Sequence, residues 1–442
     1  MRSTLQSQLA GAVLVDGDEG YDAARSVWND MVDRRPRYIV RCASVADVAT
    51  AVRFAREHGL EIGIRCGGHG IVGHAVPHDG LMIDLRLLGD VKIDVQRRRA
   101  RVEGGALLGT LDRASQPHGL ATTAGNVSHT GVGGLTLGGG MGWLARQHGL
   151  SCDNVVAFEV VTATGELLEA SADSHPELYW ALRGGGGNFG VVTAFEFVLH
   201  PEPGEVTTVE VLVPLTGAAP AMRHWRDLSA SAPRQATFNA LIDGDTVSLG
   251  FVWVGAPVEG RAQTEALVGA LDETGGRRSR IETMSYLQLQ SREDDVKGHA
   301  WRRYWKGHYF SSLGDELIDA LLDRSGALLP AASLQAYGGA IADVPDDATA
   351  FSRRNTAFEF VAAARWDDPA EDDDRMDAAR RYAATMDRFA SGVYVNVLGD
   401  DGEHGIRRAY SREKLTRLTA VKDTYDPSNL FHLNQNIRPS AG

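Results

Sequence analysis

The sequence has 442 residues, of which 43% are hydrophobic and 23% charged, so the chain can bury large cores and is not intrinsically disordered. The length predicts two domains, because a single hydrophobic core usually stops growing below this size. A formal net charge of −13 argues against nucleic-acid binding, and without an apolar run of about 18 residues we expect no membrane-spanning segment. The three cysteines are scattered and odd in number, so we do not expect a disulfide framework. A reducing compartment, the cytoplasm, is therefore the expected location.

The first 204 residues alternate helical and extended patterns and predict an α+β domain. Ser44 is expected to cap a helix that carries an apolar stripe and ends at Gly59. Strands are predicted at residues 61–65, 81–85, 91–95, 100–103, 154–163, 166–169 and 190–199, and further helices at 106–118 and 176–182.

The pattern changes after the Pro-Glu-Pro-Gly segment at 201–204. Long alternating strands at 206–215, 236–242 and 247–254 interleave with amphipathic helices near 261–273 and 314–323. Residues 205–390 are therefore predicted to form a second, α/β domain with an antiparallel sheet flanked by helices. The acidic segment 368–375 is expected to be an exposed connection, and Val393–Val397 a strand.

Glycine runs are the most informative local feature, because glycine lets backbone N–H groups approach phosphate closely. Between Gly131 and Gly142, seven of twelve residues are glycine, and no Walker motif occurs. A GxGxxG match begins at Gly185, but it follows a helix and precedes a strand, the reverse of the dinucleotide-binding order. The remaining interpretation is that several separated loops converge on one extended dinucleotide.

Four ordered motifs carry a resemblance to a known family: RCGGHGIVGH at 65–74, GNVSHTGVGGLTLGGGMGWLARQHGLSCDN at 125–154, GGGGNFGVVTAFEF at 184–197, and YVN at 394–396 followed by YDPSNLFHLNQNIRP at 425–439. The chain resembles berberine-bridge-enzyme-like members of the vanillyl-alcohol-oxidase (PCMH-type) flavoproteins, with hydroxynicotine and antibiotic-tailoring oxidases nearest in style. The resemblance implies a two-part FAD-binding domain at 1–204, a substrate-binding domain at 205–390, and a segment at 391–442 that returns to the FAD domain.

The resemblance also implies that FAD is bound covalently through His69, whose flanking glycines would line the pyrophosphate and the edge of the ring. Some relatives attach FAD a second time through a cysteine, but the aligned position here is Val127, so a single attachment is expected. Cys152 is interpreted as a small packed residue. The positions implied to contact FAD are Arg65, Cys66, Gly67, Gly68, His69, Gly70, Gly73, His74, Gly125, Val127, Thr130, Gly131, Gly133, Gly134, Gly138, Gly139, Trp143, Leu150, Asp153, Asn154, Gly190, Val191, Val192, Tyr394, Asn396, Asn434 and Asn436.

Catalytic candidates follow from the same alignment. Tyr394 and Asn396 would share one face of a strand beside the flavin, with Tyr394 orienting or deprotonating the substrate or else packing in a core. Thr130 would lie at the reactive face, where a compact residue leaves room for O2. Glu359, flanked by phenylalanines, could act as a base, although an outward-facing carboxylate is the favoured interpretation. The aromatic cluster at 304–309 is typical of a core, and no metal-ligand spacing is present.

The resulting expectation is an FAD-dependent oxidase of secondary metabolism, which oxidises an alcohol, amine or sugar hydroxyl of a small molecule and reduces O2 to hydrogen peroxide. Three alternatives remain open. They are a flavin dehydrogenase with another electron acceptor, an enzyme of oxidative cyclisation, and a flavin storage protein without turnover. The substrate and the oligomeric state cannot be derived from the sequence.

Overall fold

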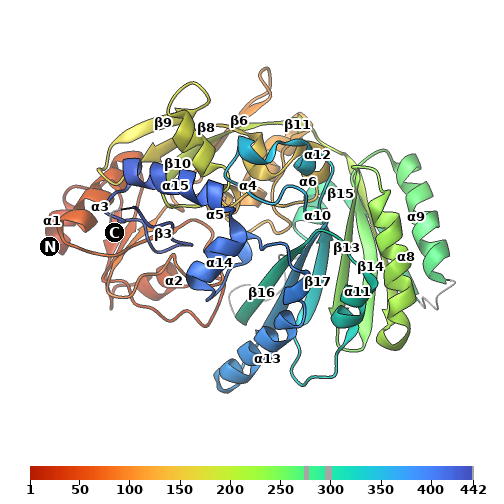
Figure 1. Cartoon of the computed structure of the whole chain (residues 1–442). Coiled ribbons are helices and arrows are strands. Elements are labelled where there is room, and N and C mark those ends of the chain that lie inside the picture. The colour runs from red at the N-terminus through yellow and green to blue at the C-terminus, as the bar shows by residue number, and fades with distance from the viewer. Residues whose placement is uncertain (273–277, 293, 295–300, 441–442) are drawn as a thin grey trace.

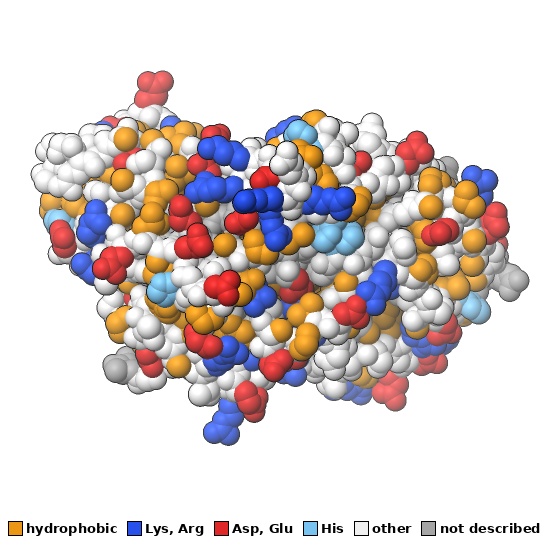
Figure 2. All heavy atoms as spheres, turned by 90° about the horizontal axis from the view of Figure 1, so that it is seen from above, with side chains coloured by type: hydrophobic (Ala, Val, Ile, Leu, Met, Phe, Trp, Pro, Cys, Tyr) orange, Lys and Arg blue, Asp and Glu red, His pale blue; other side chains and the backbone are white. Residues whose placement is uncertain are grey.

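The structure, a computed structural model, describes residues 1–272, 278–292, 294 and 301–440. Helices pack on several sheets, most of whose strand pairs are antiparallel, in agreement with the expected fold class. Figure 1 shows the N-terminal elements on one side and a large sheet with its helices on the other, while the C-terminal helices α14 and α15 lie back over the N-terminal side. Figure 2 shows acidic and basic side chains interspersed over one face, so the net negative charge is not concentrated there.

The first sheet has the strand order β1-β2-β4-β3, in which β2 and β3 run parallel to β4. Ser44 caps α3 as predicted, because its side chain accepts a hydrogen bond from the Asp47 backbone N–H. The bounds in this layer are α1 Arg2–Gln6, β1 Ala12–Leu14, α2 Tyr21–Arg25, β2 Tyr38–Arg41, α3 Val45–Glu57, β3 Ile62–Arg65 and β4 Leu81–Asp84.

The second sheet has the order β5-β6-β10-β8-β9 and is antiparallel throughout. The glycine-rich segment forms the short helix α5 between these strands, and the GxGxxG match lies between α7 and β10, in the expected non-Rossmann order. The bounds here are β5 Val91–Asp94, β6 Arg99–Glu103, α4 Leu108–Ser115, β7 Leu120–Ala121, α5 Val132–Leu137, α6 Ala145–His148, β8 Val155–Val161, β9 Leu167–Ser171, α7 Pro176–Leu182, β10 Val191–Val198 and β11 His200–Pro201.

The largest sheet has seven strands in the order β15-β12-β14-β13-β17-β18-β16. One face is apolar and packs on α8, α9, α11 and α13 through residues such as Phe238 and Phe360. The bounds are β12 Glu205–Pro214, α8 Ala218–Ala230, β13 Ala236–Asp243, β14 Thr246–Trp253, α9 Pro257–Asp272, β15 Arg278–Ser285, α10 Tyr286–Gln290, β16 Arg302–Phe310, α11 Asp315–Leu322, β17 Ala331–Ala336, α12 Ala340–Asp343, β18 Phe358–Trp366 and α13 Asp372–Ala384.

The opposite face of this sheet carries a row of polar residues. Tyr309 pairs with Glu359, Glu359 with Gln335, and Gln335 with Asn239. Residues directly opposite one another in paired strands point to the same side. The row therefore runs across four strands on the face that lacks the helices.

Two segments differ from the prediction. Residues 368–375 do not form a plain connection: a 3-10 turn at Pro369–Glu371 leads into α13, whose first turn contains three aspartates. Acidic side chains are favourable at a helix N-terminus, and Asp372 also accepts hydrogen bonds from Arg302 and Trp366. The charges that resembled a solvated loop therefore start a helix.

The predicted strand at Val393–Val397 is also wrong. Tyr394 has an extended backbone and caps a 3-10 turn at Val395–Val397. An alternating run of five residues is too short to distinguish a strand from an irregular segment held by side-chain hydrogen bonds. After it, α14 (Gly402–Ala409) and α15 (Arg412–Tyr425) return to the N-terminal side, where Lys422 donates to the carbonyl of Asn188.

No helix in the described ranges has the length and apolar character needed to cross a bilayer.

Candidate active site

The loop after β3 packs backbone to backbone against the glycine-rich loop before α5. A Cβ added at Gly67 would lie 2.3 Å from the backbone nitrogen of Gly131, and one at Gly131 would lie 2.4 Å from that of Gly67. Because neither position tolerates a side chain, glycine is required at both. The contact fixes His69 and Thr130 on neighbouring loops.

The His69 ring is held on several sides. Its Nε2 lies 2.7 Å from Nδ1 of His129, and its Nδ1 lies 3.3 Å from Oγ1 of Thr130. The ring also stacks on Trp28, with centroids 4.9 Å apart, and the Arg303 guanidinium lies 3.8 Å above the Trp28 ring. The structure thus brings together two predicted site residues, His69 and Thr130.

Trp28, His129 and Arg303 were missed by sequence reasoning. His129 directly precedes Thr130 in the quoted motif, so its position could have indicated it. Trp28 and Arg303 carry no such signal, because they lie 275 residues apart in the sequence and meet only in the fold.

The loops present a cradle that suits an extended dinucleotide. A Cβ placed at Gly70, Gly134 or Gly187 would meet nothing within 4 Å, although these glycines lie in segments distant in sequence, two of them in loops and Gly134 in α5. The side-chain oxygens of Asn434 and Asn436 are buried and have no hydrogen-bond partner in the protein, and Asn434 donates to the carbonyl of Gly187. Open glycine backbone and unpaired buried polar atoms are the features expected where a flavin dinucleotide binds.

Other implied cofactor residues lie around these loops. Gly138 and Gly139 lie against Asn396 and Phe351, and Gly133 lies near the carbonyl of Gly104. Burial lowers the pKa of His74 to about 4, so its ring is neutral near pH 7.

A further group is engaged in internal structure. Asp153 forms a buried ion pair with Arg354 at 2.7 Å and accepts a hydrogen bond from the backbone of Leu150. The Asn154 amide donates to two backbone carbonyls and its oxygen lies 2.6 Å from His200 Nε2. These polar groups are satisfied within the protein.

The remaining positions are also packed. Arg65 is buried and donates to the carbonyl of Ala24, and burial lowers its pKa to about 10. Cys66 lies against Gly131, Gly125 against Leu108 and Leu135, and Gly190 against Val160, while Val191 and Val192 are buried on β10. Cys152 is completely buried, as expected of a small packed residue, and burial raises its pKa.

Tyr394 and Asn396 lie together even though they are not on a strand. The Tyr394 hydroxyl accepts hydrogen bonds from the backbone N–H of Gly140 and from the Asn396 amide, both at 2.8 Å. The Asn396 amide also donates to the carbonyl of Leu135 at 3.1 Å. Burial raises the pKa of Tyr394, so the phenol keeps its proton and is suited to donate a hydrogen bond rather than act as a base.

Glu359 does not face solvent, and the favoured interpretation of it was wrong. Its carboxylate is buried and accepts a hydrogen bond of 2.6 Å from the Tyr337 hydroxyl. Burial raises its pKa from 4.5 to about 7, and the Tyr337 hydrogen bond opposes part of that shift. The strand alternates as predicted, but the face expected to be solvated is covered, because Tyr394 and the loop with Asn126 lie against it.

Three tyrosines connect this carboxylate with the glycine loop. The hydroxyls of Tyr337 and Tyr309 lie 3.4 Å apart, and the rings of Tyr309 and Tyr394 are 6.3 Å apart between centroids. The aromatic residues of β16 are therefore largely core, as predicted, but Tyr309 belongs to both the core and the site. A buried carboxylate with a pKa near neutrality is suited to accept a proton.

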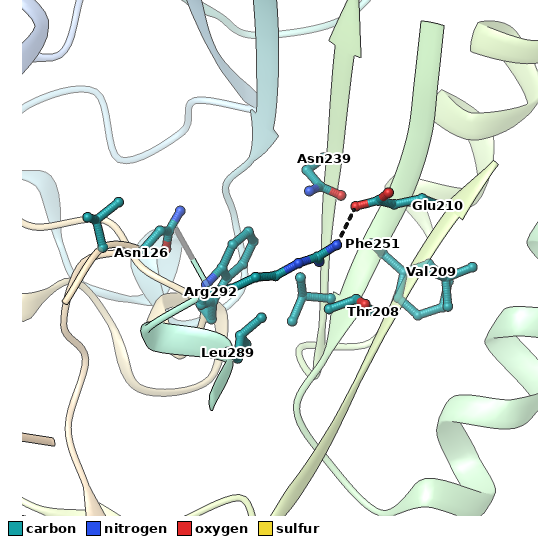
Figure 3. Close-up of a pocket in the computed structure, with 11 residues that line it drawn as sticks. Asn126, Thr208, Val209, Glu210, Asn239, Phe251, Leu289 and Arg292 are labelled. Carbon is teal, nitrogen blue, oxygen red and sulfur yellow. Dashed lines mark hydrogen bonds and ion pairs between the residues drawn. The ribbon is translucent and has the colours of Figure 1, made fainter. Parts of the chain in front are cut away.

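A cavity of about 210 Å³ lies at the Asn239 end of the polar row, between the sheet face and the loop that carries Asn126 and Val127 (Figure 3). Val127 and Trp143, both implied cofactor contacts, line this cavity. Within the described ranges, no group of three or more His, Cys, Asp or Glu side chains is arranged to hold a metal ion.

Comparison with known proteins identifies the family. Residues 36–171 match a family model described as an FAD binding domain, and residues 393–438 match one described as berberine and berberine like. The (R)-6-hydroxynicotine oxidase of Paenarthrobacter nicotinovorans is 31% identical over the whole of both chains. A xylooligosaccharide oxidase of Thermothelomyces thermophilus is 26% identical over 94% of this chain and 90% of that protein.

The solved structure of 6-hydroxy-D-nicotine oxidase from Arthrobacter nicotinovorans superposes with a TM-score of 0.87 at 28% identity, and the match covers 98% of both chains. Sequence and fold agree over the full length, and the matched models include the loops with His69 and Gly131 and the segment with Tyr394 and Asn396. The chain therefore belongs to the berberine-bridge-enzyme-like family of FAD-linked oxidoreductases.

Proposed function

We propose that the chain is an oxidase with FAD attached covalently through His69, which oxidises a carbon bearing a hydroxyl or amine in a small molecule. When bound, FAD would accept a hydride from that carbon and pass two electrons to O2, which yields hydrogen peroxide. The observation that carries the proposal is the buried Glu359, linked through tyrosines to the loops that would hold the flavin.

Glu359 is the proposed general base. As hydride leaves the substrate carbon, the attached O–H or N–H must lose its proton, and a carboxylate with a pKa of about 7 accepts it near neutral pH. The Tyr337 hydrogen bond occupies one carboxylate oxygen and fixes the group, which leaves the other oxygen for the substrate.

Tyr394 is proposed to orient the substrate. Its hydroxyl oxygen already accepts from Gly140 and Asn396, which directs its own proton toward a third partner. Because the pKa of Tyr394 is raised, it donates that proton in a hydrogen bond and does not replace Glu359 as the base.

His129 is proposed to position His69 for attachment. The 2.7 Å bond between their rings, together with stacking on Trp28, restricts rotation of the His69 ring, so its Nδ1 faces Thr130. A fixed orientation reduces the entropy that must be lost when a single bond to the cofactor forms.

Hydroxyl and amine substrates are both compatible with this arrangement. One relative is named for oxidation of hydroxynicotine and another for oxidation of a xylooligosaccharide. A carboxylate base with a pKa near neutrality and a phenol donor serve either class, so the class depends on the rest of the cavity.

The test is peroxide release by the purified protein across alcohols, amines, sugars and phenols. We expect stoichiometric peroxide with at least one class, and peroxide release at least about 100-fold slower from the Glu359→Gln variant on that substrate. Rapid flavin reduction without peroxide, followed by reoxidation only with a quinone or dye, would replace the oxidase by the dehydrogenase alternative. No reduction by any compound would favour flavin storage.

A further inference from the structure

The cavity at the Asn239 end of the polar row is large enough for a group of its own. Its volume is about 210 Å³, whereas a cavity of about 150 Å³ holds benzene. Figure 3 shows Asn239 and Glu210 on the sheet and Asn126 on the facing loop, with Arg292 extending between them. The space suits one six-membered ring with substituents.

The charges that line the cavity are paired within the protein. Arg292 lies 3.4 Å from Glu210 and also 3.4 Å from Glu282, and Glu282 lies 2.7 Å from Arg280. An anionic ligand would meet Glu210, and a cationic ligand would compete with Arg292 for the same carboxylate. The cavity therefore favours an uncharged ligand.

Hydrogen-bonding groups for such a ligand lie in and next to the lining: Asn126 and Trp143 line the cavity, and Gln335, outside the lining, pairs with Asn126. The Asn126 amide donates to the Gln335 carbonyl oxygen at 3.3 Å, which leaves Asn126 Oδ1 and Gln335 Nε2 buried without a protein partner. Rotating both amides by a half-turn still leaves one donor and one acceptor. Trp143 Nε1 is a further buried donor at the cavity without a partner. A hydroxyl, which both donates and accepts, matches this set.

The cavity also lies at a defined separation from the proposed base. Asn239 pairs with Gln335 and Gln335 with Glu359, so all three point to the same face. Two strand spacings of about 4.8 Å place Asn239 roughly 10 Å from Glu359. That separation corresponds to two linked rings.

We propose that this cavity is a distal subsite, which binds an uncharged, hydroxyl-bearing ring of a two-ring substrate while the other ring presents the oxidised carbon to Glu359. This inference rests on the proposed oxidase function and adds to it the size, charge and hydrogen-bonding character of the substrate.

Matched probes test the subsite in the holoenzyme. Salicin and salicyl alcohol share a benzyl alcohol and differ by an uncharged sugar ring, as cellobiose and glucose differ by one ring. In anaerobic flavin reduction, the reduction rate constant divided by the apparent Kd should be at least about tenfold higher for one two-ring compound than for its one-ring partner. The glucuronide of salicyl alcohol should lose that advantage, because its carboxylate meets Glu210.

Two variants and one control localise the effect. In Asn239→Leu, the efficiency of flavin reduction by a two-ring compound divided by that by its one-ring partner should fall close to one. In Glu210→Gln, the efficiency with the glucuronide should come closer to that with salicin. Ser333→Ala, on the same sheet face but outside the cavity lining, should leave both ratios unchanged. The flavin absorbance of each variant verifies that it is folded and loaded.

The outcomes separate the subsite from the oxidase. A two-ring to one-ring ratio close to one in wild type, or the wild-type ratio in Asn239→Leu, would overturn the subsite. Turnover of the one-ring compounds would still support the oxidase. If no compound reduces the flavin, the proposed function fails, and tryptophan-fluorescence titration with salicin and cellobiose decides the subsite. Absence of saturable binding at millimolar concentration would overturn it.

Discussion

Replacement of Glu359 by glutamine tests the proposed base, because glutamine keeps the size of the side chain and can still accept from Tyr337. Loss of a positioned general base costs roughly 100- to 10,000-fold in rate. With a pKa of about 7, the carboxylate fraction of Glu359 rises from about 9% at pH 6 to about 91% at pH 8. Flavin reduction in the wild type should therefore rise about tenfold over this range and flatten above it, as expected for a single titrating base.

The assay is anaerobic stopped-flow reduction across pH 5.5–9. Flavin reduction in Glu359→Gln should be slow at every pH and should not increase with pH. Glu316→Gln, on the exposed surface of α11, should keep the wild-type rate and its increase with pH. A wild-type rate that does not change between pH 6 and 8, or a glutamine variant with wild-type rates, would refute the role of Glu359.

The same carboxylate predicts a stability change of known sign. A pKa raised from 4.5 to about 7 in the folded state means that stability present below pH 4.5 is lost as pH rises to about 7. The full shift corresponds to about 3 kcal/mol. Glutamine does not titrate, so Glu359→Gln should not lose this stability. The free energy of unfolding of the variant minus that of the wild type should therefore increase between pH 5 and pH 8, as measured by denaturant titration. A difference that is constant with pH would contradict the raised pKa.

Three further substitutions separate roles within the site. Tyr394→Phe removes the oxygen that accepts from Gly140 and Asn396, and should slow flavin reduction at least about tenfold with flavin content unchanged. Rates equal to wild type would return Tyr394 to a packing role. Cys152→Ser should retain covalent flavin, because Cys152 is completely buried and packed in the core, and loss of the attached flavin would show that the glycine segment was misaligned. Thr130→Leu should slow reoxidation by air while flavin reduction by substrate is largely kept, and unchanged reoxidation would remove Thr130 from the oxygen path.

Local features of the fold were predictable from the sequence. The capped helix α3, the strands around the first glycine loop and the hairpin of β8 and β9 follow from caps, alternation and turn residues that act over a few positions. The glycine positions of the site came instead from the family resemblance, and the close backbone approach of Gly67 to Gly131 explains why both are glycine.

Features that depend on long-range packing were not predictable. The sheet face that carries Glu359 is covered by segments distant in sequence, such as the loop with Asn126, and alternation cannot tell a solvated face from a covered polar one. Trp28 and Arg303 meet across more than 270 residues, and no local pattern records that contact. The strand predicted at Val393–Val397 does not form. The hydrogen bonds that hold this segment come from Leu135 in α5 and from Gly140, which are distant in the sequence, so the local pattern could not show them.

Covalent attachment of FAD through His69 is the central claim, and acid precipitation of the purified protein tests it most directly. Flavin that is only hydrogen-bonded leaves the denatured chain, whereas flavin joined by a covalent bond precipitates with it. The wild-type pellet should be yellow, and the intact chain should be heavier by the mass of one FAD. The His69→Ala pellet should be colourless and lack that mass. A colourless wild-type pellet, or a yellow pellet from His69→Ala, would contradict the account.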